Sequence, residues 1–345
     1  MNDKKNKTDQ TVDEDVIVHT PFRDARMEFQ RNKLAVAGMI FITLVILSAI
    51  FAPLITPYHF ATQNTGGNRA APMEGYTITE SHLEECHWKD TPIEWGCTIY
   101  LVGSDVLGRD LFSRVIYGTR ISLSVALVAA TIALGIGAVL GTISGYYGGW
   151  IDNLFMRVVD FLYAIPLLPI IILMQVYFQA LSRRGVNEGI AGTLIRWNQA
   201  SGGLMFLFIA LGFLNWIGMA RLARGQVLSY KNKEFIEAAK AVGATNSRIV
   251  FKHLMPNIMG PLLIAESLAI PGYIFTEAIL SFIGLGVIPP IPSWGSMIFD
   301  GYQGIRSAAY LVLVPGLALT FLTLSFNFFG DGLRDALDPK MRGRS

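Results

Sequence analysis

The stretch Arg221–Pro256, RLARGQVLSYKNKEFIEAAKAVGATNSRIVFKHLMP, is the most informative part of the sequence, because it is a charged segment between two long apolar runs. The apolar run before it ends near Ala220, and the run after it begins near Ile258. Basic side chains outnumber acidic ones in the stretch, which holds Arg221, Arg224, Lys231, Lys233, Lys240, Arg248 and Lys252 but only Glu234 and Glu237 as acids. Membrane proteins concentrate Lys and Arg in their cytoplasmic loops. The stretch is therefore predicted to be a cytoplasmic loop between two membrane spans.

The composition agrees with a chain that lies mostly in a membrane. Hydrophobic residues make up 52% of the 345 residues and charged residues only 16%, which is too apolar for an ordinary soluble domain. A helix rises about 1.5 Å per residue, so about 20 apolar residues cross the hydrocarbon core. Six runs meet this requirement: Leu34–Ile55, Ile121–Tyr146, Phe161–Ala180, Gly203–Ala220, Ile258–Phe282 and Tyr310–Phe329. We expect an all-α polytopic membrane protein with six transmembrane helices.

The flanks of the spans predict their orientation. The first span follows a basic flank that contains Arg23, Arg26, Arg31 and Lys33, whereas the segment 57–102 is mainly acidic. An N-in, C-in topology places the basic flanks inside, although it leaves Arg183, Arg184 and Arg196 outside.

The polar start Met1–Thr20 lacks the apolar run of a signal peptide. Residues Phe22–Lys33 form either a helix on the inner surface, with Phe22, Ala25 and Phe29 toward lipid, or only a basic flank.

The fifth apolar run is longer than one straight crossing needs, because it continues through Val287. We expect its outer end to be tilted, bent at Pro271 or placed at the membrane interface.

In the second run, Gly137, Gly141 and Gly145 recur at the spacing of small residues that allow close helix packing. Flexing of the helix during a transport cycle is the alternative role for these glycines.

The charged loop contains the pattern of two short helices. Phe235, Ala238, Ala239 and Val242 fall at i, i+3, i+4 and i+7, which gives a first helix one apolar face. Gly243 interrupts this helix, and Thr245 can cap a second one. Such a pair would form a rigid knob, where the small alanines allow a partner to approach and Glu237 offers a carboxylate. The alternative is a solvated basic loop that only obeys the charge rule.

The sequence offers no motif for catalysis or nucleotide binding. It contains no G-x-x-x-x-G-K-[ST] loop for phosphates, no H-E-x-x-H metal motif and no G-x-S-x-G nucleophile. The five histidines are scattered. We therefore expect no catalytic residues, no metal site and no cofactor in this chain, and no nucleic-acid partner. If the protein is driven by ATP, the ATPase must be another chain.

The loop resembles the EAA loop of permeases of ATP-binding-cassette (ABC) importers. Glu237, Ala238, Ala239, Gly243 and Pro256 carry the resemblance. It implies that these residues, together with Ala244 and Thr245, couple the chain to an ATPase. In that family the loop docks in a groove of the ATPase and transmits its closure. This chain departs from the usual pattern at His253 and Met255, where Ile and Leu are common, and we interpret those positions as packing sites.

The resemblance extends to the C-type subunit of oligopeptide and dipeptide permeases. It rests on Arg31–Ala35, Ala49–Pro53, Gly103–Asp110, Tyr117–Arg120, Phe275–Glu277, Leu280–Gly286, Ser293–Gly295 and Gly332–Pro339. It implies a type I ABC-importer permease fold with cytoplasmic coupling helices, in a bacterial plasma membrane. The implied partners are a homologous second permease, two ATPase subunits that use ATP and Mg²⁺, an extracytoplasmic peptide receptor and membrane lipids.

This resemblance also suggests how the chain is divided. We expect a cytoplasmic segment over residues 1–33, the first transmembrane helix over 34–56 and an extracytoplasmic loop over 57–118. A permease core over 119–329 would hold the other five transmembrane helices and the coupling loop 221–256, and a cytoplasmic tail would follow over 330–345. The outer loop over Gln63–Thr98 and the segment Ser182–Ser201 look longer than in many relatives.

Cys86 and Cys97 are the only cysteines, and both lie in the outer loop. A disulfide is plausible outside the cell and could contribute about 3 kcal/mol by restricting the unfolded chain. A second hypothesis is that the two cysteines are free thiols. A Cys/His metal site is a third, because His82 and His87 lie close to Cys86 in the sequence.

Ionisable residues inside apolar runs are candidates for a transport pathway, because a charge that faces lipid costs several kcal/mol. Glu266 lies mid-span and Glu277 nearer the outer end, so both are candidate pathway or gating residues. Glu266 could instead hydrogen-bond a neighbouring helix. Arg157 and Asp160 are expected to pair with each other or with the interface.

Peptide import is the function that these observations favour. An importer for nickel or another small solute is the alternative in the same family, since related permeases share the motifs. An ATP-independent channel or secondary transporter would need carboxylates at matching depths in two repeated halves, and no internal repeat is found. A membrane-anchored scaffold or signalling protein would need a sizeable inner domain, which the sequence lacks.

Overall fold

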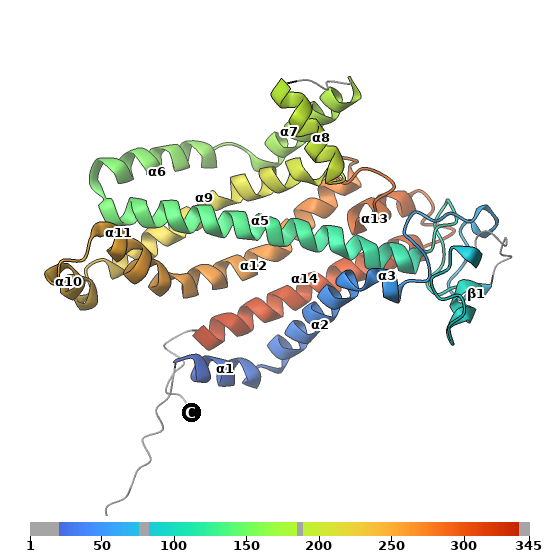
Figure 1. The fold of residues 1–345 in the computed structure, drawn as a ribbon, viewed down its shortest axis with the longest axis horizontal. Coiled ribbons are helices and arrows are strands. Elements are labelled where there is room, and N and C mark those ends of the chain that lie inside the picture. The colour runs from blue at the N-terminus through green and yellow to red at the C-terminus, as the bar shows by residue number, and fades with distance from the viewer. Residues whose placement is uncertain (1–20, 76–82, 185–188, 338–345) are drawn as a thin grey trace, which may run out of the picture.

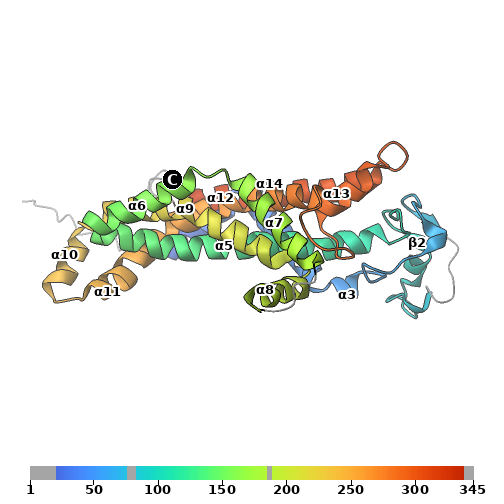
Figure 2. The same ribbon diagram turned by 90° about the horizontal axis from the view of Figure 1, so that it is seen from above.

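Five long helices form the body of the computed structural model, which describes residues 21–75, 83–184 and 189–337. They are α2 (Lys33–Ile50), α5 (Leu111–Tyr147), α9 (Leu204–Tyr230), α12 (Met255–Phe282) and α14 (Tyr310–Leu337). Each is long and apolar enough to cross a membrane. α5 packs along α9 and α12, and α14 packs against α2 and α12. In Figures 1 and 2 these helices run lengthwise, with α10 and α11 at one end and the β-strands at the other.

The third predicted span is broken. In its place, α6 (Gly149–Tyr163) and α7 (Leu167–Arg183) meet at an angle of 75°, so the described residues give six spans only if this pair counts as one. The span expected over Phe161–Ala180 is therefore present as a bent pair, and α7 covers most of the predicted range. The break falls at Pro166, because proline has no N–H to donate and disfavours the helical conformation of the residue before it. α8 (Gly189–Ala200) follows and leads into α9.

Other helices differ from the predicted spans in where they begin and end. α5 begins ten residues before Ile121, where Asp110 caps it by accepting hydrogen bonds from the Ser113 N–H at 2.7 Å and the Ser113 hydroxyl at 2.6 Å. α9 continues ten residues beyond Ala220. α12 ends at Phe282 and the chain turns at Gly284, where φ is +81°. The apolar residues up to Val287 therefore extend the run but not the helix.

Small residues bring α5 and α9 together, as their spacing predicts. A Cβ added at Gly141 would lie 2.3 Å from the Ala220 carbonyl oxygen, and one at Gly137 would lie 2.5 Å from the Met219 Cβ. Neither position can carry a side chain unless the helices separate. The close packing predicted for this glycine series is therefore confirmed.

The amino-terminal helix α1 (Pro21–Arg31) packs on the carboxyl-terminal one. The rings of Phe29 and Phe329 meet edge to face with centroids 5.8 Å apart. The expectation that Phe29 faces lipid is wrong, because α14 offers it an apolar surface. The side chain of Phe22 lies outside the described residues. α1 and the end of α14 lie at the same end of the molecule as α10 (Figure 1), in agreement with an N-in, C-in topology.

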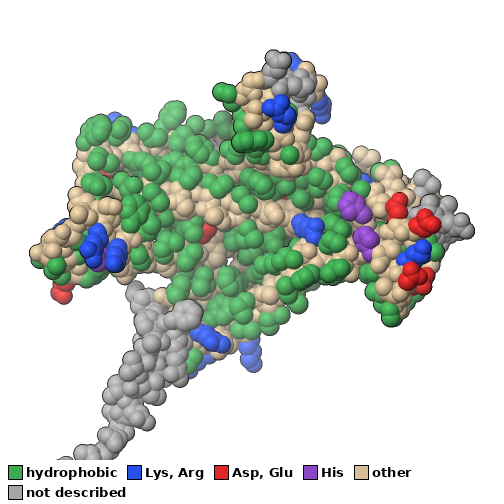
Figure 3. Space-filling view, in the orientation of Figure 1, with side chains coloured by type: hydrophobic (Ala, Val, Ile, Leu, Met, Phe, Trp, Pro, Cys, Tyr) green, Lys and Arg blue, Asp and Glu red, His purple; other side chains and the backbone are tan. Residues whose placement is uncertain are grey.

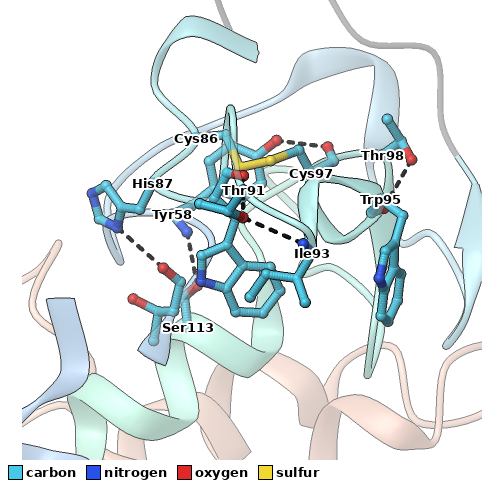
Figure 4. The surroundings of a disulfide bond; sticks show 11 residues. Tyr58, Cys86, His87, Thr91, Ile93, Trp95, Cys97, Thr98 and Ser113 are labelled. Carbon is cyan, nitrogen blue, oxygen red and sulfur yellow. Dashed lines mark hydrogen bonds between the residues drawn. A yellow bond between two sulfur atoms is a disulfide. The ribbon is translucent and has the colours of Figure 1, made fainter. Parts of the chain in front are cut away.

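The outer end carries a small cap built from the segment between α2 and α5. It contains the elements α3 (Ala52–Ile55), η1 (Thr65–Gly67), β1 (Glu74–Gly75), η2 (Glu94–Cys97) and β2 (Ile99–Tyr100), with β1 antiparallel to β2. Cys86 and Cys97 form a disulfide close to Tyr58 (Figure 4). The two cysteines belong to an apolar cluster with Tyr58 and Trp88. The Tyr58 hydroxyl donates to the Cys97 carbonyl at 2.7 Å.

The described histidine near this pair, His87, bonds to the backbone and forms no metal site with the described residues around it. A ring nitrogen of His87 lies 3.1 Å from the Thr56 carbonyl oxygen, and His82 lies outside the described residues. No group of three potential metal ligands occurs within the part of the chain that the structure describes.

Buried charges fasten the cap to the helices. Arg109 pairs with Asp105 at 2.6 Å, and Arg114 of α5 approaches the same carboxylate at 3.4 Å. Both arginines also lie within 4 Å of Asp300 in α13 (Trp294–Tyr302). Burial raises the pKa of the neighbouring Asp110 to about 6, although hydrogen bonds from Ser113 oppose this shift.

Candidate functional site

The basic loop, residues 231–254, lies between α9 and α12 at the end opposite the cap (Figure 1). It contains α10 (Glu234–Ala241), α11 (Asn246–Arg248) and a π-helical turn, η3 (Ile249–Leu254), that runs into α12. Lys and Arg side chains gather at this end, whereas hydrophobic side chains cover most of the helical face in view (Figure 3). The loop is thus a folded projection rather than an open connection.

Ile236 attaches α10 to the helices. Its side chain is 0% exposed and belongs to an apolar cluster with Ile249, Leu254 and Ile258. The apolar face that the sequence predicts for this helix points outward instead: Phe235 is 40% exposed and Val242 is 90% exposed. Ala238 is exposed beside them and Ala239 is half-buried. The loop therefore presents an apolar surface that no described residue covers.

Gly243 ends α10 through its backbone conformation. Its φ is +84°, a left-handed value that glycine adopts without the Cβ penalty of other residues. The Gly243 N–H donates to the Lys240 carbonyl at 2.9 Å, and the Ala244 N–H donates to the Ala239 carbonyl at 3.0 Å. These two bonds make up the Schellman motif, which satisfies the last carbonyls of a helix. An added Cβ would meet nothing within 4 Å, so the requirement for glycine is one of backbone geometry.

The second half of the loop begins at Thr245. The Thr245 hydroxyl accepts from the Arg248 N–H at 3.4 Å and caps α11, which confirms the predicted N-cap. The Tyr146 hydroxyl donates to the Asn246 side chain at 2.8 Å, and the Lys231 ammonium donates to the Gly145 carbonyl at 3.2 Å. The loop is therefore tied to the inner end of α5 at two points.

The return to the membrane runs through the π-helical turn. Ile249, Val250 and Leu254 are buried there, whereas His253 and Met255 are only half-buried. The packing role expected of His253 and Met255 is therefore taken mainly by the three buried residues. Pro256 lies in the first turn of α12, where its missing N–H leaves no helical bond unmade. Glu237 is exposed and makes no ion pair among the described residues.

Two arginines of α9 pair with α6, an arrangement that sequence analysis missed. Arg224 donates two hydrogen bonds to Asp152, both at 2.6 Å, and the Ser144 hydroxyl of α5 donates to the same carboxylate at 2.6 Å. Arg221 pairs with Asp160 at 2.6 Å. The pair expected between Arg157 and Asp160 is wrong, because α9 brings a partner from 61 residues away. These contacts join α5, α6 and α9 beside the basic loop.

The two membrane carboxylates occupy different surroundings. Glu277 is fully buried, and its two oxygens accept hydrogen bonds from the Ser122 hydroxyl at 2.8 Å and the Ser281 hydroxyl at 2.6 Å. Glu266 accepts a hydrogen bond from the Tyr273 hydroxyl at 2.8 Å and lines a hollow between α9 and α12. Both residues lie along α12, so the structure does not gather them with the basic loop.

Comparison with known proteins decides the family. Residues 137–343 match the family of binding-protein-dependent transport system inner membrane components, and residues 20–72 match the N-terminal transmembrane domain of oligopeptide transport permease C. The chain belongs to this family of inner-membrane transport components. The permease is therefore a multi-pass inner-membrane subunit of a binding-protein-dependent ABC transport system, with the type I importer fold.

Curated relatives align over most of the permease. It is 38% identical to the oligopeptide transport system permease protein OppC of Bacillus subtilis, over 93% of this chain and 90% of that protein. It is 38% identical to the dipeptide transport system permease protein DppC of Alkalihalophilus pseudofirmus, over 94% and 91%. The glutathione transport system permease protein GsiD of Pectobacterium atrosepticum is 33% identical over 95% and 94%.

Among solved structures, the permease is similar to a chain of the MetNI methionine ABC transporter in inward-facing conformations. The sequence identity is 18% and the TM-score 0.45, over 65% of this chain and 96% of that chain.

Proposed function

We propose that the permease imports oligopeptides or dipeptides, driven by ATPases that dock on its basic loop. The observation that carries the cargo assignment is the set of relatives named for oligopeptide and dipeptide transport, which align over nearly the whole chain. No side chain of the permease is needed for nucleotide chemistry in this scheme. Two cytoplasmic ATPase subunits use ATP and Mg²⁺, a homologous second permease completes the membrane part, and an extracytoplasmic receptor delivers the peptide.

The exposed face of α10 supports the docking part of the proposal. Phe235 and Val242 are large apolar side chains in water-accessible positions, and Ala238 between them leaves room for close approach. Contiguous exposed apolar surface is a common mark of a protein–protein interface. Glu237 on the same helix offers a carboxylate to a basic group of the partner. Gly243 and Thr245 hold the two short helices at a fixed angle, so Ala239, Ala244 and Pro256 act as supports of this surface.

The contacts of the loop suggest how a push on α10 would reach the membrane. Ile236 transmits force into the apolar cluster at the start of α12. Tyr146 and Lys231 connect the loop to the inner end of α5. Because packed elements move as rigid bodies, closure of the ATPases would shift α5 and α12 together. The shift would alternate the permease between inward- and outward-facing states.

A reconstituted transporter tests the cargo and the coupling together. The permease is purified with its co-expressed partner subunits, placed in proteoliposomes and supplied with receptor, ATP and labelled dipeptide or oligopeptide. We expect ATP-dependent peptide uptake and co-elution of two ATPases and a second permease. A lone, stable chain that carries solute without ATPases would contradict the importer function, and uptake of Ni²⁺ instead of peptide would contradict the cargo.

A matched pair of substitutions isolates the coupling role within the same assay. Glu237→Gln should abolish most uptake while the chain remains inserted, because it removes the carboxylate offered to the ATPase. Glu234→Gln, on the same helix and also exposed, should leave uptake nearly unchanged. Equal uptake by the two variants would refute a coupling role for Glu237.

A further inference from the structure

A hollow of about 410 Å³ opens between α9 and α12 within the membrane part of the permease. Its walls include small residues, among them Gly218 and Gly272, where an added Cβ would meet nothing within 4 Å. The two helices therefore do not fill this space themselves. Four polar side chains also line it: Asn215, Glu266, Tyr273 and Thr276.

Only one of the two carboxylate oxygens of Glu266 accepts a hydrogen bond from a described residue. The residue is only 5% exposed, and the Tyr273 hydroxyl donates to its Oε1 at 2.8 Å. Its Oε2 has no hydrogen-bond donor among the described residues. Glu277, eleven residues further along α12, differs from Glu266, because both of its carboxylate oxygens accept hydrogen bonds from serines. Glu266 thus keeps one acceptor available beside the hollow.

Asn215 and Thr276, the other polar residues of the hollow, each donate one hydrogen bond to a backbone carbonyl of their own helix. The Asn215 amide donates to the Leu211 carbonyl at 2.7 Å, and the Thr276 hydroxyl donates to the Gly272 carbonyl at 2.8 Å. Apart from the second N–H of the Asn215 amide, what remains for a ligand is a set of acceptor oxygens. None of the described lining residues is Lys, Arg or His. The hollow is therefore suited to a positively charged group that carries several N–H donors.

The depth of Glu266 makes an occupant energetically important. It is the twelfth residue of α12, about 17 Å from the inner end of that helix at about 1.5 Å per residue. This places the carboxylate near the middle of the membrane, where an unpaired charge costs several kcal/mol. A cation that enters the hollow would offset that cost. A helix of another subunit packed permanently in the hollow would offset this cost only if it brought a hydrogen-bond donor to the carboxylate.

We propose that this hollow is a cation-binding subsite of the translocation pathway, in which Glu266 and Asn215 receive a primary ammonium group of the passing solute. For peptide cargo, which rests on the proposed function, that group is the free amino terminus. Tyr273 is a positioning residue that holds the carboxylate through Oε1 and leaves Oε2 toward the ligand. The site recognises a charge that every unblocked peptide carries, so it is compatible with many side chains.

Cysteine accessibility tests this site without knowledge of the cargo. The two native cysteines are joined, so Ala269→Cys, on a residue that lines the hollow, adds a single free thiol to the permease. The complete transporter in proteoliposomes is treated with cationic and anionic thiosulfonate reagents of similar size. We expect the cationic reagent to react roughly tenfold faster, an electrostatic preference of ordinary size. Glu266→Gln should remove this preference, and Glu234→Gln should leave it in place.

The same thiol reports on the occupant. A dipeptide with a free amino terminus should slow its modification, and the N-acetylated dipeptide should not, provided that Glu266 is present. An unreactive thiol in every variant would mean that a helix of the second permease fills the hollow, and would overturn the proposal. Equal rates for the two reagents, or equal protection by the two peptides, would also overturn it. A cation preference without any peptide uptake would support the cation site and contradict the peptide cargo instead.

Discussion

Gly243 illustrates at the residue scale how one backbone conformation supports a surface. Its φ of +84° ends α10 and directs the chain into α11. A β-branched residue is strongly disfavoured in this region, where L-residues lose roughly 1–2 kcal/mol, whereas Asn tolerates it better. We predict that Gly243→Val lowers ATP-driven uptake severalfold while Gly243→Asn retains most of it. Quantification of the permease in the membrane controls for insertion, and similar uptake by both variants would show that the conformation is unimportant.

Local signals predicted some residues of the site and not others. Gly243 and Thr245 were predictable because a helix end is determined by its own few residues. Ile236 was missed as an anchor, because the periodicity of α10 cannot tell whether an apolar face meets its own chain or a partner. The Arg224–Asp152 pair joins residues 72 apart, and no spacing rule connects them. Pairing across helices is a property of the packed structure.

At the element scale, α10 has an inner and an outer side that should respond differently to substitution. Ile236→Ala removes a fully buried side chain, and such a change costs about 2–5 kcal/mol. Val242→Ala alters an exposed position, where substitutions usually stay within about 0.5 kcal/mol. We predict that Ile236→Ala lowers the thermal stability of the purified permease, whereas Val242→Ala leaves it unchanged and weakens ATPase co-elution. The reverse pattern would mean that the outer face is not an interface.

The spans were predictable as apolar runs, but their breaks and ends were less so. Hydropathy located α2, α9, α12 and α14, because burial in lipid requires continuous apolar sequence. It could not determine that Pro166 breaks the third span by 75°, since proline only bends a membrane helix when neighbours allow it. The early start of α5 was likewise missed, because polar side chains of its outer end are buried against the cap rather than in lipid.

At the scale of the whole molecule, the topology makes a prediction that labelling can check. Ile190 of α8 is 83% exposed and Val242 lies in the basic loop. In intact cells, a membrane-impermeant maleimide should label Ile190→Cys, whereas Val242→Cys should react only after the membrane is opened. The disulfide between the native cysteines keeps the background low. Labelling of Val242→Cys from outside would contradict the N-in, C-in topology.

The exposed face of α10 is the place where we propose that the ATPase binds. A photo-reactive amino acid at position 242, activated in membranes that contain the complete transporter, tests this contact. The same amino acid at Leu54, an exposed position at the outer end, serves as the control. We predict a covalent adduct between the permease and an ATPase subunit from position 242 and none from position 54. No ATPase adduct from position 242, in a preparation that still transports peptide, would show that the ATPase binds elsewhere.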